Sequence, residues 1–126
     1  MATILVVDDE PQVVLMIAKA LEGEGHTVLV ARSGAEAISV WKSRPGEIDL
    51  LLTDFEMPDM DGAAVARSLR AAAPELPVIL ISGGSRALSN LVPRPSQFLP
   101  KPFSIGDLAQ LTHSMVSASL LPGRPH

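Results

Sequence analysis

Short apolar runs alternate along the chain with segments whose apolar residues recur at helical spacing. Each run ends in polar or turn-forming residues, which is typical of the buried strands of a parallel sheet. The five runs are Thr3–Val7, Thr27–Ala31, Leu50–Asp54, 78–81 and 97–100. We therefore predict five strands, each followed by a helix.

Local signals place the ends of these helices. Pro11 suits the first turn of a helix because its missing N–H has no intrahelical partner there, and Gly23 ends that pattern. Ser33 and Glu36 have the spacing of a capping box at the start of the second helix. We expect the remaining helices from Gly62 to Pro74, near 85–91, and from about residue 104.

Strict alternation of strand and helix predicts a parallel sheet with helices on both faces. The carboxyl ends of all its strands then lie along one rim, where such sheets bind their ligands. Asp54 alone is equally compatible with a solvated loop. Five polar residues of catalytic type follow apolar runs, however, and together they indicate a site: Asp8, Asp9, Asp54, Ser82 and Lys101.

Composition narrows the class of protein. The chain has 126 residues, 47% of them hydrophobic, which is enough for one globular domain with a core. The absence of cysteine excludes disulfides and thiolate metal sites. No apolar run is long enough to span a membrane, and no secretory signal is visible. We therefore expect a soluble, cytoplasmic protein with no membrane partner.

The acidic residues are concentrated at the predicted rim. Seven of the fourteen acids lie in residues 8–10 and 54–61, and the remainder of the chain without them carries a net charge of +3. This local acidity is expected of a cation site. Basic residues are scattered without interleaved aromatic residues, so we expect no nucleic-acid partner.

The polar residue types at the rim favour one chemistry. Crowded carboxylates repel one another unless a cation holds them ionised, and few protein ligands plus waters suit Mg²⁺. Adjacent Asp8 and Asp9 lack the alternating spacing of a calcium-binding loop. A hard cation beside a carboxylate nucleophile, a hydroxyl and an ammonium is suited to phosphoryl transfer.

The sequence resembles the receiver domain of two-component response regulators over nearly its whole length. The matching motifs are Asp8-Asp9, Asp54, Met57-Pro58, Asp61-Gly62, Ser82 and Lys101-Pro102. The resemblance implies a flavodoxin-like α/β fold with five helices and strand order 2-1-3-4-5. It also implies a receiver domain at 1–121, followed by a short tail at 122–126 without an output domain.

The resemblance assigns roles to the acidic residues. Asp54 is implied to accept a phosphoryl group from the phosphohistidine of a histidine kinase. Asp9 and Asp54 are implied to bind Mg²⁺ directly, Asp8 through water, and Glu56 through its backbone carbonyl.

The resemblance also implies how the signal is switched. Ser82 matches the switch hydroxyl and Lys101 its ammonium partner, and the Lys101-Pro102 peptide matches a cis bond of the family. Phe98 occupies the switch-aromatic position. Phe98 is equally compatible with a simple core residue of an edge strand.

Two departures from the family mark where this chain is expected to differ. The segment from Ser82 to Lys101 is about one helical turn short and contains Gly83, Gly84, Pro93 and Pro95, so the fourth helix is expected to be short or irregular. Glu56 and Gly84 flank the acceptor and the switch hydroxyl. We expect them to tune phosphoryl lifetime toward a short value, with Glu56 repelling the phosphoryl group or pairing with Lys101.

The leading interpretation is a stand-alone receiver in a phosphorelay. It is not a classical enzyme, because it catalyses only its own phosphorylation and dephosphorylation. Its expected partners are a histidine kinase or histidine phosphotransfer protein and an unknown downstream protein. A receiver fragment of a hybrid histidine kinase, a haloacid-dehalogenase-like phosphatase and a non-phosphorylated scaffold are the alternatives. The phosphatase fits poorly because it needs Asp-x-Asp after an early strand.

Overall fold

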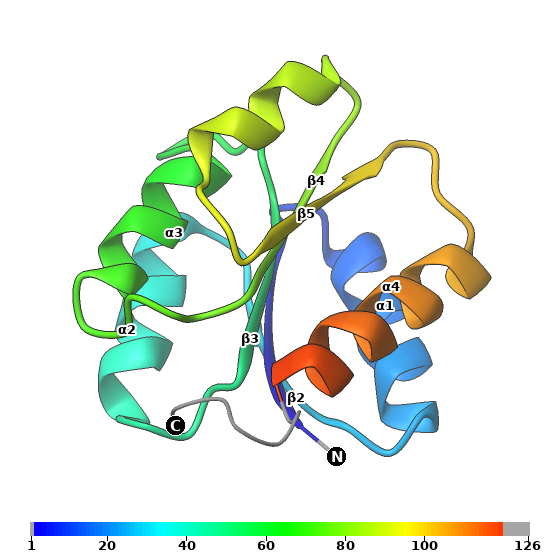
Figure 1. The fold of residues 1–126 in the computed structure, drawn as a ribbon, viewed down its shortest axis with the longest axis horizontal. Helices are drawn as coiled ribbons and strands as arrows, with labels where there is room; N and C mark the ends of the chain where they lie inside the picture. Colours follow the sequence, from blue (N-terminus) through cyan, green and yellow to red (C-terminus); the bar gives the residue numbers. More distant parts are fainter. Residues whose placement is uncertain (1, 120–126) are drawn as a thin grey trace.

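The computed structural model describes residues 2–119, which form a parallel five-stranded sheet between two layers of helices (Figure 1). The strands are β1 (Thr3–Val7), β2 (Thr27–Ala31), β3 (Leu50–Asp54), β4 (Val78–Ser82) and β5 (Ser96–Pro100), in the order β2-β1-β3-β4-β5. The predicted flavodoxin-like fold and strand order are thus confirmed. The expected tail at 122–126 lies outside the described residues.

Helices cover both faces of the sheet. Helices α2 (Gly34–Ser43) and α3 (Gly62–Arg70) lie on one face, and α1 (Pro11–Gly23) and α4 (Ile105–Ser119) lie on the other (Figure 1). Among the described residues, no helix is both long and apolar enough to cross a membrane.

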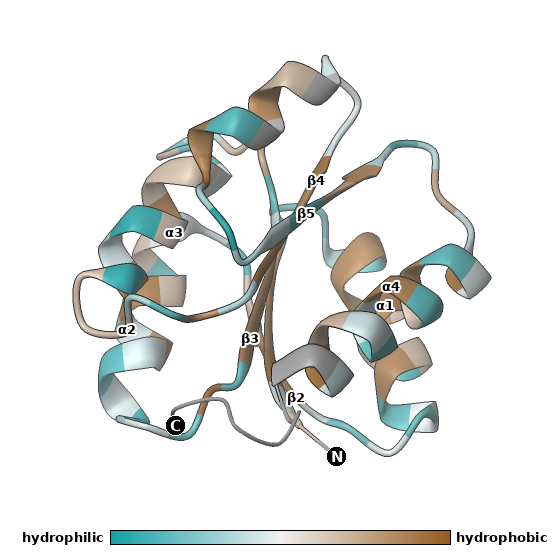
Figure 2. Ribbon diagram, in the orientation of Figure 1, coloured by the Kyte–Doolittle hydropathy of each residue, from teal (hydrophilic) through white to brown (hydrophobic). Residues whose placement is uncertain are grey.

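The alternation of side chains along the strands divides the core into two layers. Leu5, Leu51 and Leu80 point toward α2 and α3, whereas neighbouring residues such as Ile4 and Leu52 point toward α1 and α4. Strands β3 and β4 are buried over their full length, and Figure 2 shows the central strands as hydrophobic along most of their length. Burial on both faces explains why these strands are near-continuous apolar runs.

Two helix ends differ from the prediction. The Ser33 hydroxyl caps α2 by accepting the N–H of Glu36, but the Glu36 carboxylate accepts the N–H of Arg32 and not that of Ser33, so the capping box is only half formed. Helix α3 ends at Arg70, before the expected Pro74. Helical hydrogen bonding nevertheless continues almost to Pro74, since the N–H of Ala73 donates to the carbonyl of Leu69.

The expected fourth helix is replaced by a short 3₁₀ helix, η1 (Arg86–Leu91). The prediction of a short or irregular element is therefore confirmed, although the described residues contain four α-helices and not five. The guanidinium of Arg70 anchors the chain on both sides of this region. It donates to the carbonyls of Leu76 (2.8 and 3.0 Å), Pro95 (2.7 Å) and Pro93.

Candidate functional site

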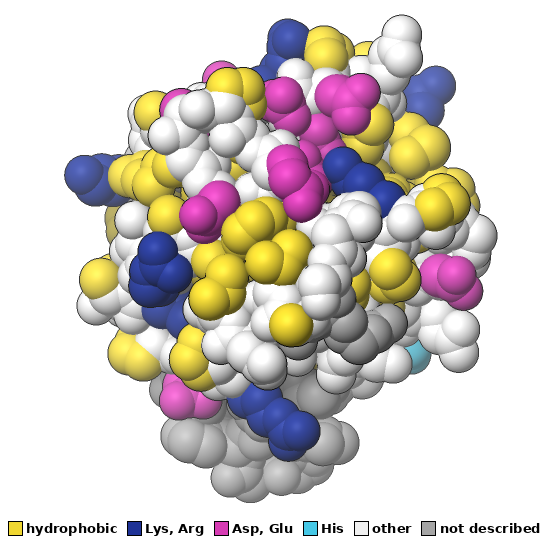
Figure 3. Space-filling model, turned by 90° about the horizontal axis from the view of Figure 1, so that it is seen from above, with side chains coloured by type: hydrophobic (Ala, Val, Ile, Leu, Met, Phe, Trp, Pro, Cys, Tyr) yellow, Lys and Arg dark blue, Asp and Glu magenta, His cyan; other side chains and the backbone are white. Residues whose placement is uncertain are grey.

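The carboxyl ends of four strands bring the predicted site residues to one edge of the sheet. Asp8 follows β1, Asp54 and Ser82 end β3 and β4, and Lys101 follows β5. Seen from above this edge, acidic side chains gather next to a basic one (Figure 3). The register in which β3 pairs with β4, and β4 with β5, fixes how far along the strands Asp54, Ser82 and Lys101 lie relative to one another.

Three aspartates form a potential cation site. Asp8, Asp9 and Asp54 each offer a carboxylate oxygen, and these oxygens lie within 4.8 Å of one another. Asp8 is only 1% exposed, and its Oδ2 atom is buried without a hydrogen-bond partner, while its Oδ1 accepts the N–H of Glu10 at 2.9 Å. A buried, unpartnered carboxylate oxygen aimed at two further carboxylates fits a hard cation such as Mg²⁺.

The electrostatics of the aspartates agree with this geometry. Burial raises the pKa of Asp54 from 3.8 to about 6, against the hydrogen bond from Lys101, and the neighbouring Asp8 raises it further. Burial likewise raises the pKa of Asp8, against the hydrogen bond from the Glu10 N–H. The negative charge of both carboxylates is therefore incompletely compensated in the folded chain, and a divalent cation would compensate it.

Lys101 pairs directly with the expected phosphoryl acceptor. Its Nζ lies 2.9 Å from Oδ1 of Asp54. Burial lowers the pKa of Lys101, but the hydrogen bond to Asp54 and the nearby carboxylates outweigh it, so the pKa is raised overall. The Lys101–Pro102 peptide bond is cis, and the Lys101 N–H donates to the carbonyl of Ser82 at 2.9 Å.

The hydroxyl of Ser82, the expected switch residue, makes a contact that the sequence did not indicate. Ser82 is fully buried, and its hydroxyl donates to Oε2 of Glu56 at 2.5 Å while accepting the N–H of Gly84 at 2.9 Å. Glu56 thus binds Ser82, whereas the ion pair of Lys101 is made with Asp54. The expected alternative of a Glu56–Lys101 ion pair is not what the structure contains.

The acids that follow Asp54 do not all belong to the cation site. Asp61 caps α3 by accepting the N–H of Ala64 at 2.8 Å. Asp59 accepts the N–H groups of Gly34 and Ala35 at 3.1 and 3.0 Å and so caps α2. These hydrogen bonds lower the pKa of Asp59. The acidity of residues 54–61 therefore has a partly structural origin.

Phe98 and the histidines lie apart from this cluster. Phe98 is 7% exposed and belongs to the core layer that contains Leu80. Nδ1 of His26 accepts the N–H of Ala2 at the opposite end of β1, and His113 is exposed on α4. His126 lies outside the described residues.

Residues 4–113 match the family model of the response regulator receiver domain. The chain belongs to that family. The receiver is 38% identical over 118 residues to the sensor kinase CckA of Brucella abortus, covering 91% of this chain but only 12% of CckA. It is 34% identical to the response regulator receiver protein CpdR of the same species, covering 94% of this chain and all of CpdR.

Solved structures give the same assignment. The response regulator TrrA of Thermotoga maritima, crystallised in complex with Mg²⁺ and beryllofluoride, has a TM-score of 0.79 and 29% identity, with 91% of this chain and 99% of that chain covered. The receiver spans a small part of some relatives and the whole of CpdR. Full-length activities of the longer relatives therefore do not transfer with the match.

Proposed function

We propose that this receiver accepts a phosphoryl group on Asp54 from a histidine kinase or histidine phosphotransfer protein. The observation that carries the proposal is the placement of Asp54, whose buried carboxylate lies between the ammonium of Lys101 and the carboxylates of Asp8 and Asp9. A nucleophile, a cation site and a fixed positive charge at one point are the parts that phosphoryl transfer needs.

In this mechanism a carboxylate oxygen of Asp54 attacks the phosphorus of a phosphohistidine. The phosphorus–nitrogen bond breaks, its electron pair stays on the imidazole, and Asp54 becomes an acyl phosphate. Lys101 holds Asp54 in place and then pairs with the phosphoryl oxygens. Asp8, Asp9, Asp54 and the backbone carbonyl of Glu56 would hold Mg²⁺, which when bound supplies positive charge for those oxygens. Hydrolysis returns the free carboxylate, so no other substrate is turned over.

The phosphoryl group is proposed to recruit the hydroxyl of Ser82. That hydroxyl must leave Glu56, because its only proton is donated there. Phe98 is proposed to follow Ser82 as the switch aromatic. A Cβ at Gly84 would lie 3.3 Å from Ser82 Oγ, so the glycine leaves the phosphoryl group open to water, in line with a short lifetime.

A groove beside Lys101 offers a docking place for the phosphoryl donor. It has a volume of about 390 Å³ and is lined by Val13, Met16 and Phe103 as well as Lys101. Leu15 and Met16 on α1 are 63% and 42% exposed and so add to the apolar surface of this helix. We propose that the helix carrying the donor histidine packs against α1 here.

We propose that the chain acts as a stand-alone receiver, with its domain at 1–121 and its output through protein contact or onward phosphotransfer. The full coverage of CpdR supports this organisation. The 38% identity to part of CckA supports the second candidate, a receiver that works inside a hybrid kinase.

Labelling with acetyl phosphate and Mg²⁺ tests the phosphoryl acceptor. We expect one phosphoryl group per chain in the wild type and none in Asp54→Asn, with Asp107→Asn on the exposed surface of α4 as the matched control. Sustained turnover of p-nitrophenyl phosphate would instead favour a phosphatase. Labelling that persists in Asp54→Asn would place the acceptor elsewhere.

A further inference from the structure

A groove on the side of the molecule away from α1 is left open where the short η1 replaces a full helix. It lies between α3 and η1, has a volume of about 520 Å³, and is lined mainly by apolar residues, among them Ala66, Ala71, Val92 and Pro93. Leu91 at its edge is 46% exposed. An apolar groove bordered by such a side chain is typical of a protein-binding surface.

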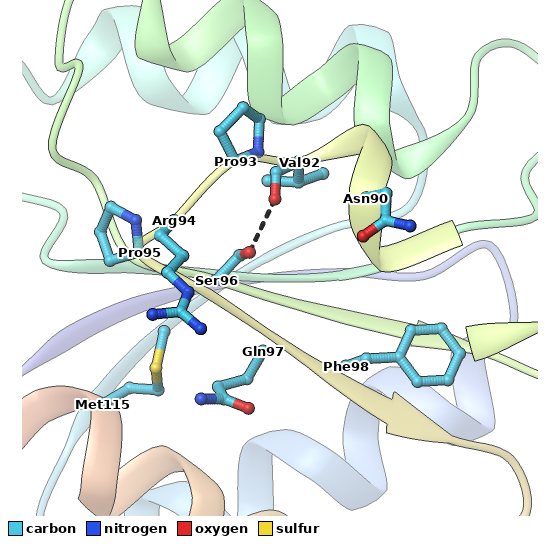
Figure 4. Close-up of a pocket in the computed structure, with 9 residues that line it drawn as sticks. All are labelled: Asn90, Val92, Pro93, Arg94, Pro95, Ser96, Gln97, Phe98 and Met115. Carbon is cyan, nitrogen blue, oxygen red and sulfur yellow. Dashed lines mark hydrogen bonds between the residues drawn. The ribbon is translucent and has the colours of Figure 1, made fainter. Parts of the chain in front are cut away.

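The charged residues that line this groove are of one sign. Its charged lining residues are Arg67, Arg70 and Arg94, with no acid among them. Within residues 2–119, neither Arg67 nor Arg94 forms an ion pair. Arg94 also lines the neighbouring hollow, where Figure 4 shows its side chain directed toward Gln97 and Met115. Two uncompensated guanidinium groups therefore flank the segment that forms one wall of the groove.

The groove is held in shape by Arg70. Its guanidinium is committed to the carbonyls of Leu76, Pro93 and Pro95 and so fixes the wall at 93–95 against α3. A binding site that is already formed loses less conformational entropy when a partner binds.

The groove is also connected to the switch hydroxyl. Ser82 accepts the N–H of Gly84, and a Cβ at Gly84 would lie 3.1 Å from Cδ1 of Leu88, a residue of η1. When Ser82 turns toward a phosphoryl group, its hydrogen bonds to Glu56 and Gly84 are expected to change, and η1, which lies close to Gly84, is expected to shift with them. Phosphorylation is thereby expected to alter the groove.

We propose that this groove binds an acidic amphipathic segment of a downstream partner protein. Apolar side chains of the segment would pack between α3 and Leu91. One of its carboxylates would pair with Arg67 beside the groove, and another would reach Arg94, whose side chain faces the neighbouring hollow (Figure 4). The inference rests on the proposed function for the partner's role as the downstream target. A nucleic acid is disfavoured by the apolar lining, and self-association of this chain through the groove is an outcome that the test below distinguishes.

Two synthetic helical peptides of about 15 residues test the proposal by fluorescence anisotropy and by NMR of the ¹⁵N-labelled chain. Both carry leucine at positions i, i+3, i+4 and i+7; one has glutamate and the other lysine at the flanking positions. With Mg²⁺ and beryllofluoride present, we expect the acidic peptide to bind at least about tenfold more tightly. Its chemical-shift changes are expected at 66–71 and 91–94.

Matched variants distinguish binding in the groove from a non-specific effect of net charge. The double variant Arg67→Glu/Arg94→Glu is expected to lower the affinity for the acidic peptide by at least about tenfold. The control Lys19→Glu/Lys42→Glu makes the same charge change at other exposed helix positions and is expected to keep the affinity within about twofold of wild type. Leu91→Ala is expected to weaken binding without lowering the melting temperature, because Leu91 is half exposed.

Equal binding of the two peptides, or shift changes confined to other residues, would overturn the proposal. Self-association in sedimentation that is abolished by Arg67→Glu/Arg94→Glu would assign the groove to a second copy instead. Phosphorylation by acetyl phosphate is measured on the same variants. If the wild type is not labelled, the proposed acceptor function is refuted. If it is labelled normally but does not bind the peptide, only the proposed role of the groove is refuted.

Discussion

The hydroxyl of Ser82 donates its only proton to the carboxylate of Glu56, which stands 26 residues earlier in the chain. The same oxygen accepts the N–H of Gly84. The hydroxyl of Ser82 is therefore committed to Glu56 in this structure, and the proposed turn of this hydroxyl toward a phosphoryl group on Asp54 would break a charge-assisted hydrogen bond. Glu56 also adds negative charge beside the acceptor, since it raises the pKa of Asp54 in addition to burial and Asp8.

Replacing Glu56 is expected to favour the phosphorylated state. Glu56→Asn removes both the charge and the bond to Ser82, and we expect about fivefold tighter beryllofluoride binding and a longer acyl phosphate lifetime, corresponding to roughly 1 kcal/mol. Glu56→Gln keeps a hydrogen-bond acceptor and isolates the charge. Beryllofluoride titration and loss of ³²P label measure the two effects. Unchanged values in Glu56→Asn would show that Glu56 does not tune the site.

Movement of Ser82 is expected to be transmitted through residues 83–98. Because Gly84 and Leu88 connect Ser82 to η1, we expect amide exchange in this segment to change when beryllofluoride is added with Mg²⁺. Hydrogen–deuterium exchange on wild type and Asp54→Asn provides the comparison. Equal protection of the segment with and without beryllofluoride would rule out a switch there.

Gly62 is expected to tolerate no side chain. A Cβ at this position would lie 2.4 Å from the backbone carbonyl oxygen of Asp54 and 3.0 Å from Leu80. Relief requires movement of the backbone that carries the acceptor, so Gly62→Ala should lower stability by about 2–4 kcal/mol and reduce labelling. Gly23→Ala is the control, since its Cβ would meet nothing within 4 Å. Thermal unfolding measures the stability, and acetyl phosphate labelling measures phosphorylation. A Gly62→Ala protein as stable as the Gly23→Ala control would contradict the prediction.

The sequence pattern predicted the site residues that lie at the carboxyl ends of strands. Asp8, Asp54 and Ser82 each come where an apolar run stops, and parallel strands bring such ends together. The prolines near 93–95 likewise predicted the loss of a full fourth helix. These features are local, so the sequence carries them in a short window.

Contacts between distant residues could not be predicted in this way. Asp59 caps the amides of Gly34 and Ala35, 25 and 24 residues away respectively, and no residue near Asp59 signals that partner. The Glu56–Ser82 bond and the reach of Arg70 to Pro93 and Pro95 are of the same kind. They depend on how α-helices and loops pack around the sheet, which one sequence without its fold does not specify.

The cluster of aspartates predicts a pH dependence in metal-free buffer. The pKa of Asp54 in the folded chain, about 6, exceeds its ordinary value of 3.8, so the folded state binds this proton more tightly than the unfolded state. Folding with an ionised Asp54 is therefore penalised above about pH 6, and the penalty is relieved as the pH falls. Asp54→Asn should be more stable than wild type by about 1–3 kcal/mol at about pH 8, and the difference should shrink toward pH 5.

Urea unfolding in EDTA across this pH range measures the effect. Adding Mg²⁺ is expected to stabilise the wild type more than Asp54→Asn, because a cation that binds only the folded state raises its stability. A wild type that is more stable than Asp54→Asn in EDTA at high pH would contradict the raised pKa.

Arg70 is expected to be the most important surface-accessible arginine for stability. Its planar guanidinium satisfies three carbonyls at once, and burial lowers its pKa without removing its charge. The single ammonium of Arg70→Lys cannot reach all three, so the carbonyls of Leu76 or Pro93 lose their partner, whereas the carbonyl of Pro95 keeps the N–H of Val78. We expect the free energy of unfolding to fall by about 2–4 kcal/mol, or the melting temperature to fall by roughly 10 °C.

Arg67→Met is the control, because Arg67 is exposed and its replacement should lower the free energy of unfolding by less than about 0.5 kcal/mol. If Arg70→Lys unfolds at the wild-type temperature, the loop at 93–95 must be held by other contacts, and the groove between α3 and η1 loses its support.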